Sequence, residues 1–367
     1  MTNPLVQLAA LGQSVWLDHI RRSLIEDGAL ARLIHEDRLS GLTSNPAIFE
    51  QALAHGREYD AAIGALAARG LDATAIYEDL ALDDIAHAAD LFYPEYRRSD
   101  GRDGFVSFEV SPHLAHDSSA TIREAHRLQA RLARPNIMIK VPATRAGLVA
   151  IASLIEDGLH VNVTLLFGVG RYREVVDAVL TGLERRLAAG QPIAAISSVA
   201  SFFLSRIDTH IDALLDAHPD SGAPQLRGQA AIASARLAYQ EYRRWRDSPR
   251  WDRLAAQGAR PPRLLWASTS TKDPSYSDVK YVEALIAADT VTTLPPDTMD
   301  AYRNHGRPAV RIDDDLDQAH ALSRRLTALG IDLEAVAATL EIEGVRKFVE
   351  PFDKLLATLR TKSAIAR

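Results

Sequence analysis

The 367-residue chain contains no cysteine, and this absence excludes a group of functions. Without thiols there is no disulfide framework, no thiolate metal site and no cysteine nucleophile. An excess of positive charge is also missing, because 42 Lys and Arg face 48 Asp and Glu, for a net charge of −6. A mildly acidic chain lacks the basic surface that nucleic-acid binding needs, so we expect no nucleic-acid partner.

Targeting and membrane signals are missing as well. The N-terminus has neither the basic segment nor the apolar core of a signal peptide. One uncharged stretch runs from Leu187 to Ser205, but it contains Gly190, Gln191 and Pro192, which predict a helix end followed by a turn. We therefore expect a cytoplasmic protein with no membrane partner. The sequence does not indicate an oligomeric state.

What the chain does contain is a regular alternation of short apolar segments with amphipathic ones. A stripe from Tyr172 to Leu187, for example, predicts a helix that stops at Gly190. Strands that alternate with helices favour a parallel sheet covered on both faces. Eight strands predict a single α/β domain over residues 1–367, a (β/α)8 TIM barrel. The expected strands are Ser14–Asp18, Gly41–Thr43, Phe105–Val110, Ile137–Val141, His160–Leu165, Ala195–Ser201, Leu264–Ser268 and Thr290–Leu294.

The alternative to a closed barrel is an open, doubly wound sheet that binds a dinucleotide. Gly168-Val169-Gly170 follows an expected strand, but Arg173 stands where the third glycine of that fingerprint belongs. A tight turn from strand to helix explains the two glycines better. The barrel is therefore the favoured architecture.

Two segments are predicted to be additions to the barrel. Residues 210–262 are long for one connection between strands 6 and 7, and they contain a strong helical pattern over 229–245. Residues 332–362 form a C-terminal helical tail with an apolar stripe, which we expect to kink at Pro351 and to pack on the barrel.

Lys140 is the first catalytic candidate, because it stands near the end of the apolar strand Ile137–Val141. A buried ammonium without a partner is costly, so such a lysine tends to lose its proton. A neutral lysine amine attacks carbonyls and forms Schiff bases. The simpler interpretation is a lysine that reaches solvent at a strand end.

Other polar residues also stand in or just after the apolar segments. Each has a simpler explanation: Asp18 and Asn45 suit helix caps, and Glu109 suits an ion pair. In a barrel, however, the carboxyl ends of all strands meet on one face, so these groups converge around Lys140. An amine, carboxyl groups, amides and hydroxyls together suit imine chemistry. The set is Asp18, Asn45, Glu109, Lys140, Asn162, Thr164, Ser201 and Ser268.

Four segments carry a family resemblance. Gly41–Phe49, Val106–Val110, Ile139–Thr144 and Val161–Phe167 resemble transaldolase, and the likeness extends from about Val15 to the C-terminal helix. The chain length looks most like the longer bacterial subfamily. The resemblance implies a transferase that uses a class I Schiff base and no cofactor. It would move a dihydroxyacetone unit from sedoheptulose 7-phosphate to glyceraldehyde 3-phosphate, giving erythrose 4-phosphate and fructose 6-phosphate, in the non-oxidative pentose phosphate pathway.

The resemblance also implies a role for each candidate residue. Lys140 matches the Schiff-base lysine, and Asp18 matches the group that takes the proton of the C4 hydroxyl. Glu109 and Thr164 match the pair that holds the water used in imine formation. The implied substrate-binding residues are Asn45, Asn162, Ser201, Phe203, Arg206, Ser268 and Lys272.

The phosphate-binding residues include one departure from the family pattern. Arg206 matches the family's phosphate-binding arginine. Shorter members have a second arginine after strand 7, whereas this chain has Lys272 there. Lysine binds phosphate as a point charge and not as a bidentate fork, so we expect it to be the weaker contact.

Four other interpretations compete for parts of this sequence. An aldolase that releases dihydroxyacetone would need nearly the same site, and a sugar-phosphate-binding protein would not need Lys140. His113 and His116 could bind a metal, but no third ligand has recognisable spacing, so no metal is expected. The arginine-rich end of 242–246 fits a helix C-terminus better than a nucleic-acid site.

Overall fold

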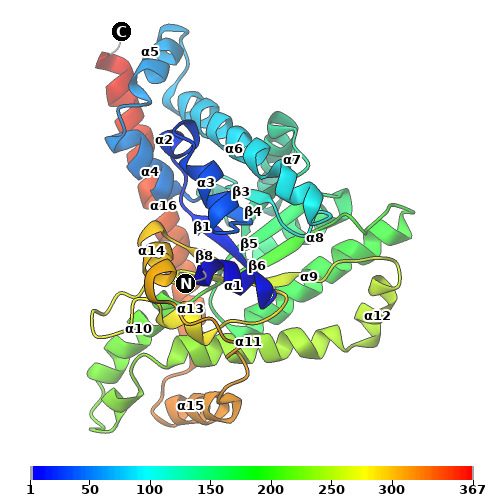
Figure 1. Ribbon diagram of the computed structural model, residues 1–367, viewed down its shortest axis with the longest axis vertical. Coiled ribbons are helices and arrows are strands. Elements are labelled where there is room, and N and C mark those ends of the chain that lie inside the picture. Colours follow the sequence, from blue (N-terminus) through cyan, green and yellow to red (C-terminus); the bar gives the residue numbers. More distant parts are fainter. Residues whose placement is uncertain (1–2, 366–367) are drawn as a thin grey trace.

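The computed structural model describes residues 3–365, and it shows eight parallel strands closed into a barrel (Figure 1). The strand order follows the sequence, and β8 pairs with β1 to close the ring. The predicted (β/α)8 fold is therefore confirmed. The strands are β1 Gln13–Asp18, β2 Gly41–Thr43, β3 Phe105–Glu109, β4 Ile137–Pro142, β5 His160–Leu166, β6 Ser198–Phe203, β7 Arg263–Ala267 and β8 Thr290–Leu294.

Helices surround the barrel and carry the chain from each strand to the next. Those before β4 are α1 Pro4–Ala10, α2 Arg22–Glu26, α3 Ala29–Glu36, α4 Pro46–His55, α5 Asp60–Ala68, α6 Ala73–Arg98, the 3₁₀ turn η1 Pro112–Leu114 and α7 Ser118–Leu132. Those after β4 are α8 Arg145–Asp157, α9 Val169–Ala188, α10 Ser205–Asp216, η2 Ala223–Leu226, α11 Ala230–Arg246, α12 Pro249–Ala255, α13 Lys280–Ala284, α14 Pro296–His305, α15 Leu316–Ala328 and α16 Leu333–Ile365.

The predicted strands agree with the observed ones to within one residue at each end, except at β6. Residues 195–197 are predicted to be strand, but Ile196 N–H donates to Ile193 O in a turn, and β6 begins at Ser198. The strand then continues past the predicted end to Phe203, because Phe203 pairs with Ala267 of β7. The expected helix stop is present, since α9 ends at Ala188 and Gly190 has φ of +71°.

A short turn joins β4 to α8. Thr144 caps α8 by accepting a hydrogen bond from Gly147 N–H at 3.0 Å. A side chain at Gly147 would collide with the carbonyl oxygen of Pro142, so only glycine lets the helix begin so close to β4. Gly168 occupies the N-cap position of α9, which agrees with a tight turn and not a dinucleotide fingerprint.

The two expected additions are both helical in the structure. The segment between β6 and β7 holds α10, η2, α11 and α12. The tail forms α16, which runs along α4 and continues through Pro351 as one helix (Figure 1). Its apolar stripe is buried, with Phe352 7% and Leu359 0% exposed. Glu334 fixes its start by accepting a hydrogen bond from Gly170 N–H at 2.9 Å.

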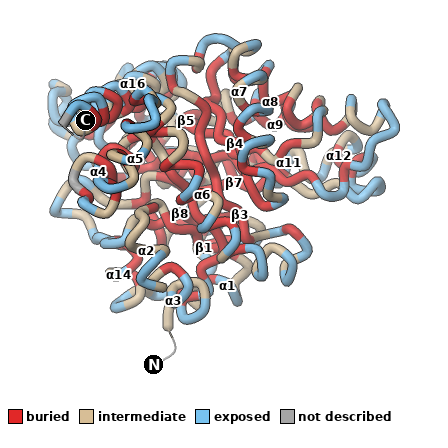
Figure 2. The backbone as a smooth tube through the Cα atoms, turned by 90° about the horizontal axis from the view of Figure 1, so that it is seen from above, coloured by how far each residue is buried: buried red, intermediate tan, exposed pale blue. Residues whose placement is uncertain are grey.

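The core consists of the strands and the inner faces of the helices (Figure 2). Branched and aromatic side chains fill it, as is typical of a closed barrel. Among residues 3–365, no helix is long and apolar enough to cross a membrane.

Candidate active site

A cavity of about 680 Å³ opens at the carboxyl ends of the strands. Its floor is formed by strand-end residues and its wall by the loops after β7 and β8 together with α16. The candidate residues that line it are Asp18, Asn45, Lys140, Ser201, Phe203, Arg206, Ser268 and Lys272. The sequence-based candidates Glu109, Asn162 and Thr164 lie in the barrel interior, each less than a tenth exposed.

Lys140 is buried at the bottom of this cavity, with 4% of its surface exposed. Its Nζ donates to the carbonyl oxygen of Ser44 at 3.0 Å and lies 3.7 Å from Glu109 Oε2. The ring of Phe348 from α16 covers it at 5.5 Å. The alternative of a lysine that reaches solvent at a strand end is therefore wrong.

Strand register explains why these groups are adjacent. Glu109 of β3 pairs with Lys140 of β4, and Lys140 pairs with Asn162 of β5. Residues at one level of neighbouring parallel strands point to the same side, here the barrel interior. The three side chains therefore form one row across the barrel.

Burial shifts the pKa values of both carboxyl groups. Loss of water raises the pKa of Glu109 to about 7, although the nearby Lys140 ammonium lowers it. Burial also raises the pKa of Asp18, which the charges of Lys140, Arg206 and Lys272 partly offset. Neither carboxylate oxygen of Glu109 has a hydrogen-bond partner within residues 3–365. A carboxyl group with a pKa near 7 is suited to give and take protons at neutral pH.

Amide and hydroxyl groups form a chain beside the lysine. Ser201 Oγ donates to Asn162 Oδ1 at 2.7 Å, and Asn162 Nδ2 donates to Ser107 Oγ at 3.0 Å. Thr164 is fully buried, and its Oγ1 has no partner among the described residues. The next residue, Leu165, has φ of +58°, at an irregularity of β5. Such strained non-glycine residues concentrate at functional sites.

Arg206 provides a cation in the same cavity. It follows β6 in the first turn of α10, with its guanidinium 5.3 Å from the Phe203 ring and 5.9 Å from the Phe348 ring. Burial lowers its pKa, and the negative charges of Asp18 and Glu109 act in the opposite direction. Its Nη1 is buried and has no hydrogen-bond partner in the described part of the chain. The group is therefore free to hold an anion.

Lys272 is the second cation of the cavity, and it is exposed. Its Nζ donates to Ser270 Oγ at 2.7 Å. Ser268, at the end of β7, has φ of +56° and shares a 2.7 Å hydrogen bond with Ser205 Oγ. Lys272 is thus near Arg206 but on a loop, where it is held less firmly.

Asn45 caps a helix and also lies at the cavity. Its Oδ1 accepts from Ile48 N–H at 3.1 Å, which caps α4 before Pro46. The residue also lines the cavity. The cap uses only the oxygen of the amide, so it does not exclude a second contact by this side chain.

Three contributors were missed from the sequence. Ser107 lies two residues before Glu109, so the alternation of strand side chains could have revealed that both point inward. Ser44 acts through its carbonyl oxygen, which side-chain chemistry does not reveal. Phe348 belongs to a helix more than 200 residues from Lys140, and no local pattern places it there.

His113, one of the two histidines considered as metal ligands, contacts the C-terminal tail. His113 Nε2 contacts Asp353 Oδ1 of α16 at 2.8 Å, so this imidazole holds the tail in place. In residues 3–365, no three or more His, Asp or Glu side chains converge as metal ligands would.

The comparisons with known proteins all indicate one family. Residues 15–359 match the family model described as Transaldolase/Fructose-6-phosphate aldolase. The chain is 47% identical to a protein named Transaldolase 2 from Nostoc sp. strain PCC 7120, over 98% of this chain and 97% of that protein. It is 46% identical to a Transaldolase from Parafrankia sp. strain EAN1pec, over 98% of both chains. It is 48% identical to a Transaldolase from Mycobacterium tuberculosis H37Rv, over 98% of this chain and 97% of the relative.

Proposed function

The chain belongs to the transaldolase/fructose-6-phosphate aldolase family and is a transaldolase, and from this premise we propose how its residues divide the chemistry. The reaction moves a dihydroxyacetone unit between sugar phosphates, in keeping with the pentose phosphate pathway. We assign the Schiff base to Lys140 and the proton transfers to Asp18 and Glu109.

Imine formation begins with Lys140. The amine must be neutral to attack the ketose carbonyl, and Glu109, 3.7 Å away with a pKa of about 7, is placed to take its proton. The carbinolamine then loses its hydroxyl as water. Glu109 returns the proton for that step, and the unpartnered Oγ1 of Thr164 helps to hold the departing water.

Carbon–carbon cleavage needs a different base. Asp18 ends β1, lines the cavity and is surrounded by three cationic groups. In this proposal it takes the proton of the C4 hydroxyl, the C3–C4 bond breaks, and its electrons flow into the iminium to give an enamine on Lys140. Erythrose 4-phosphate leaves when sedoheptulose 7-phosphate is the donor.

The enamine must then be retained until the acceptor aldehyde arrives. In this proposal Asn45 and Ser201, which line the cavity, and Asn162, which accepts a hydrogen bond from Ser201, bind the hydroxyls of the dihydroxyacetone unit. Arg206 and Lys272 supply positive charge for the phosphate at the outer part of the cavity. Reversal of the cleavage step on glyceraldehyde 3-phosphate forms the new carbon–carbon bond, with Asp18 giving its proton back. Water then hydrolyses the resulting iminium, which releases fructose 6-phosphate and regenerates the Lys140 amine.

The observation that carries this assignment is a 4% exposed lysine within 4 Å of a carboxyl group whose pKa is raised. Borohydride reduction in the presence of fructose 6-phosphate should leave a dihydroxyacetone adduct on the peptide that contains Lys140. Lys140→Met should abolish both adduct and turnover. Lys347→Met is the matched control, because Lys347 lines the same cavity but is exposed. An adduct on Lys272 or Lys347 in the wild type would refute the assignment.

A further inference from the structure

A second cavity, of about 210 Å³, lies at the opposite end of the barrel from Lys140. It is formed where β6 and β7 begin, together with the loop between α6 and β3 and the loop before β7. Strands of five or six residues, at about 3.3 Å each, place it roughly 15–20 Å from the catalytic end. Its polar lining includes Asp100, Arg102, Ser198, Arg260 and Arg263.

Two polar groups of this cavity lack a partner. Ser198 is 6% exposed, and its Oγ makes no hydrogen bond within residues 3–365. Arg260 Nη1 is buried and also has no acceptor there. Leaving a buried donor unpaired costs free energy, more so when it is charged. The two groups are thus ready for an acceptor that this part of the chain does not supply.

The Arg260 guanidinium lies against the loop between α6 and β3, but its positive charge is not neutralised there. Gly101 has φ of +71°, and a Cβ there would lie 2.8 Å from Arg260 Nη1, so the glycine permits this approach. Among the described residues, the only carboxylate within ion-pair distance is Asp100, whose Oδ2 is 3.3 Å from Arg260 Nη2. Asp100 is fully exposed, so this pair contributes little.

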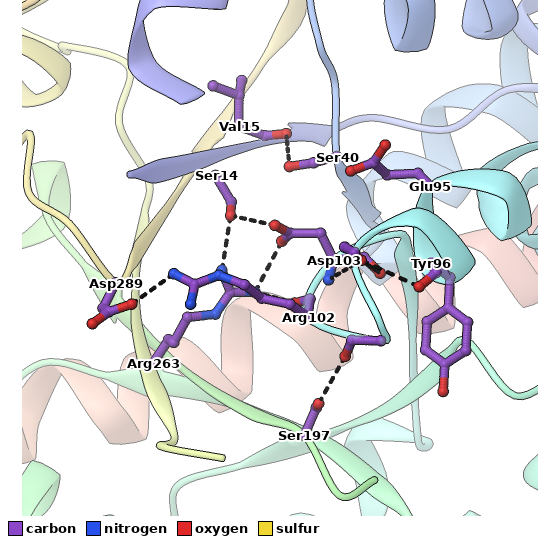
Figure 3. Close-up of polar contacts among 12 residues, drawn as sticks. Ser14, Val15, Ser40, Glu95, Tyr96, Arg102, Asp103, Ser197, Arg263 and Asp289 are labelled. Carbon is purple, nitrogen blue, oxygen red and sulfur yellow. Dashed lines mark hydrogen bonds and ion pairs between the residues drawn. The ribbon is translucent and has the colours of Figure 1, made fainter. Parts of the chain in front are cut away.

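Hydrogen bonds and ion pairs connect Arg263 and Arg102 of the cavity wall to neighbouring residues (Figure 3). Arg263 is buried at the start of β7, and its Nη1 donates to Ser14 Oγ at 2.8 Å. Its Nη2 donates to the carbonyl oxygen of Arg102 at 2.6 Å and to Asp103 Oδ1 at 2.9 Å. A guanidinium with three acceptors in fixed positions holds the loop after α6 against the barrel.

The same loop is held from its other side (Figure 3). Arg102 Nη2 donates to Asp289 Oδ1 at 2.6 Å, and Ser197 Oγ donates to the carbonyl oxygen of Gly101 at 3.1 Å. Arg102 and Arg263 therefore each have a carboxylate partner. Arg260 keeps its charge largely uncompensated, and the cavity lining has three arginines against one aspartate.

We propose that this cavity binds a phosphate group, with Arg260 and Ser198 as its principal donors. A planar guanidinium beside a hydroxyl matches the oxygens of a tetrahedral dianion. The volume holds a phosphate together with a few carbon atoms, so the source is inorganic phosphate or a small organic phosphate. A ligand there would join the loop after α6 to the starts of β6 and β7. The site is separate from Arg206, and it does not depend on the proposed roles of the catalytic residues.

The test is a count of phosphate sites by equilibrium dialysis with inorganic phosphate, repeated with glycerol 1-phosphate. Arg260→Ala should remove one site, or weaken it by roughly ten- to a hundredfold, and Ser198→Ala should act in the same direction. Asp100→Asn should tighten the site, because it removes the carboxylate that competes for Arg260. Asparagine also tolerates the positive φ of +53° at this position, so the loop should keep its shape. Arg253→Ala is the matched control, an exposed arginine of neighbouring α12. Transaldolase turnover should be unchanged in all four variants.

The two ligands identify the source of the phosphate. Tighter binding of glycerol 1-phosphate assigns the site to an organic phosphate, and equal or tighter binding of inorganic phosphate assigns it to the free anion. The proposal is wrong if the number and affinity of sites are the same in Arg260→Ala, in Ser198→Ala and in the wild type. It is also wrong if Asp100→Asn weakens binding as Arg260→Ala does, because loss of loop structure would then explain both results.

Discussion

Removal of the Arg206 guanidinium should reduce transaldolase activity only towards phosphorylated sugars. The side chain lies between Phe203 and Phe348, and its Nη1 has no acceptor in the described chain, so a substrate phosphate would be its hydrogen-bond partner. A charge-assisted hydrogen bond contributes about 1.5–3 kcal/mol, which corresponds to roughly a ten- to 150-fold loss in kcat/KM. The loss should appear mainly in KM. Arg206→Lys should recover part of it, because a lysine keeps the charge but not the bidentate fork.

The assay compares fructose 6-phosphate with unphosphorylated fructose as the donor, at several pH values. Arg206 also lowers the pKa of Asp18. Its removal should therefore raise that pKa and shift the acidic limb of the pH profile to higher pH for both donors. Comparison of the two donors at one pH cancels that effect. Lys347→Ala, which removes another cation of the cavity, is the control. If Arg206→Ala reduces kcat/KM equally for both donors, Arg206 does not hold the phosphate.

Further predictions concern both carboxyl groups, the second cation and the tail. Asp18→Ala should still form a reducible Schiff base with the intact ketose but should block cleavage by about 10²–10⁴-fold, whereas Glu109→Gln should slow imine formation itself, as single-turnover trapping would show. Between pH 4.5 and about 7, native Glu109 holds a proton that the unfolded chain has lost, so wild-type stability should fall as pH rises, by at most about 1.4 kcal/mol per pH unit. The free energy of unfolding of Glu109→Gln, measured with urea at several pH values, should lack this dependence on pH. An unchanged dependence would contradict the raised pKa of Glu109. Lys272→Ala should raise KM for fructose 6-phosphate less than Arg206→Ala does, because Lys272 is exposed, and an unchanged KM would exclude it as a phosphate ligand. Leu359→Ala should lower the free energy of unfolding by about 2–5 kcal/mol, since this fully buried side chain fixes the tail to the barrel, and a loss below about 1 kcal/mol would show that the tail is not part of the cooperative unit.

The barrel could be predicted because each strand is a short apolar segment bounded by turn residues. Both ends of β2 and β8 were located correctly, since Gly41–Thr43 and Thr290–Leu294 have clear boundaries. The start of β6 was not, because residues 195–197 are as apolar as a strand. Their turn is local, closed by the hydrogen bond from Ile196 N–H to Ile193 O, but these apolar residues carry no turn signal.

The residues that meet in the candidate site were easier to predict from the sequence than their contacts and pKa values. Side chains at strand ends converge by the geometry of a barrel alone, so the sequence was sufficient to group Asp18, Lys140 and Ser201. The value of the Glu109 pKa could not be predicted, since it depends on burial and on the 3.7 Å separation from Lys140. The contact of Phe348 was equally hidden, because it results from tertiary packing of the tail.

The position of Phe348 also matters for the order in which the protein becomes active. Its ring covers both Lys140 and Arg206, yet it lies close to the C-terminus, long after β8 has been synthesised. Domains generally begin to fold during synthesis from the N-terminal side. A nascent chain can therefore close its barrel on the ribosome with the lysine still uncovered. The Lys140 side chain is covered only once α16 docks on the barrel.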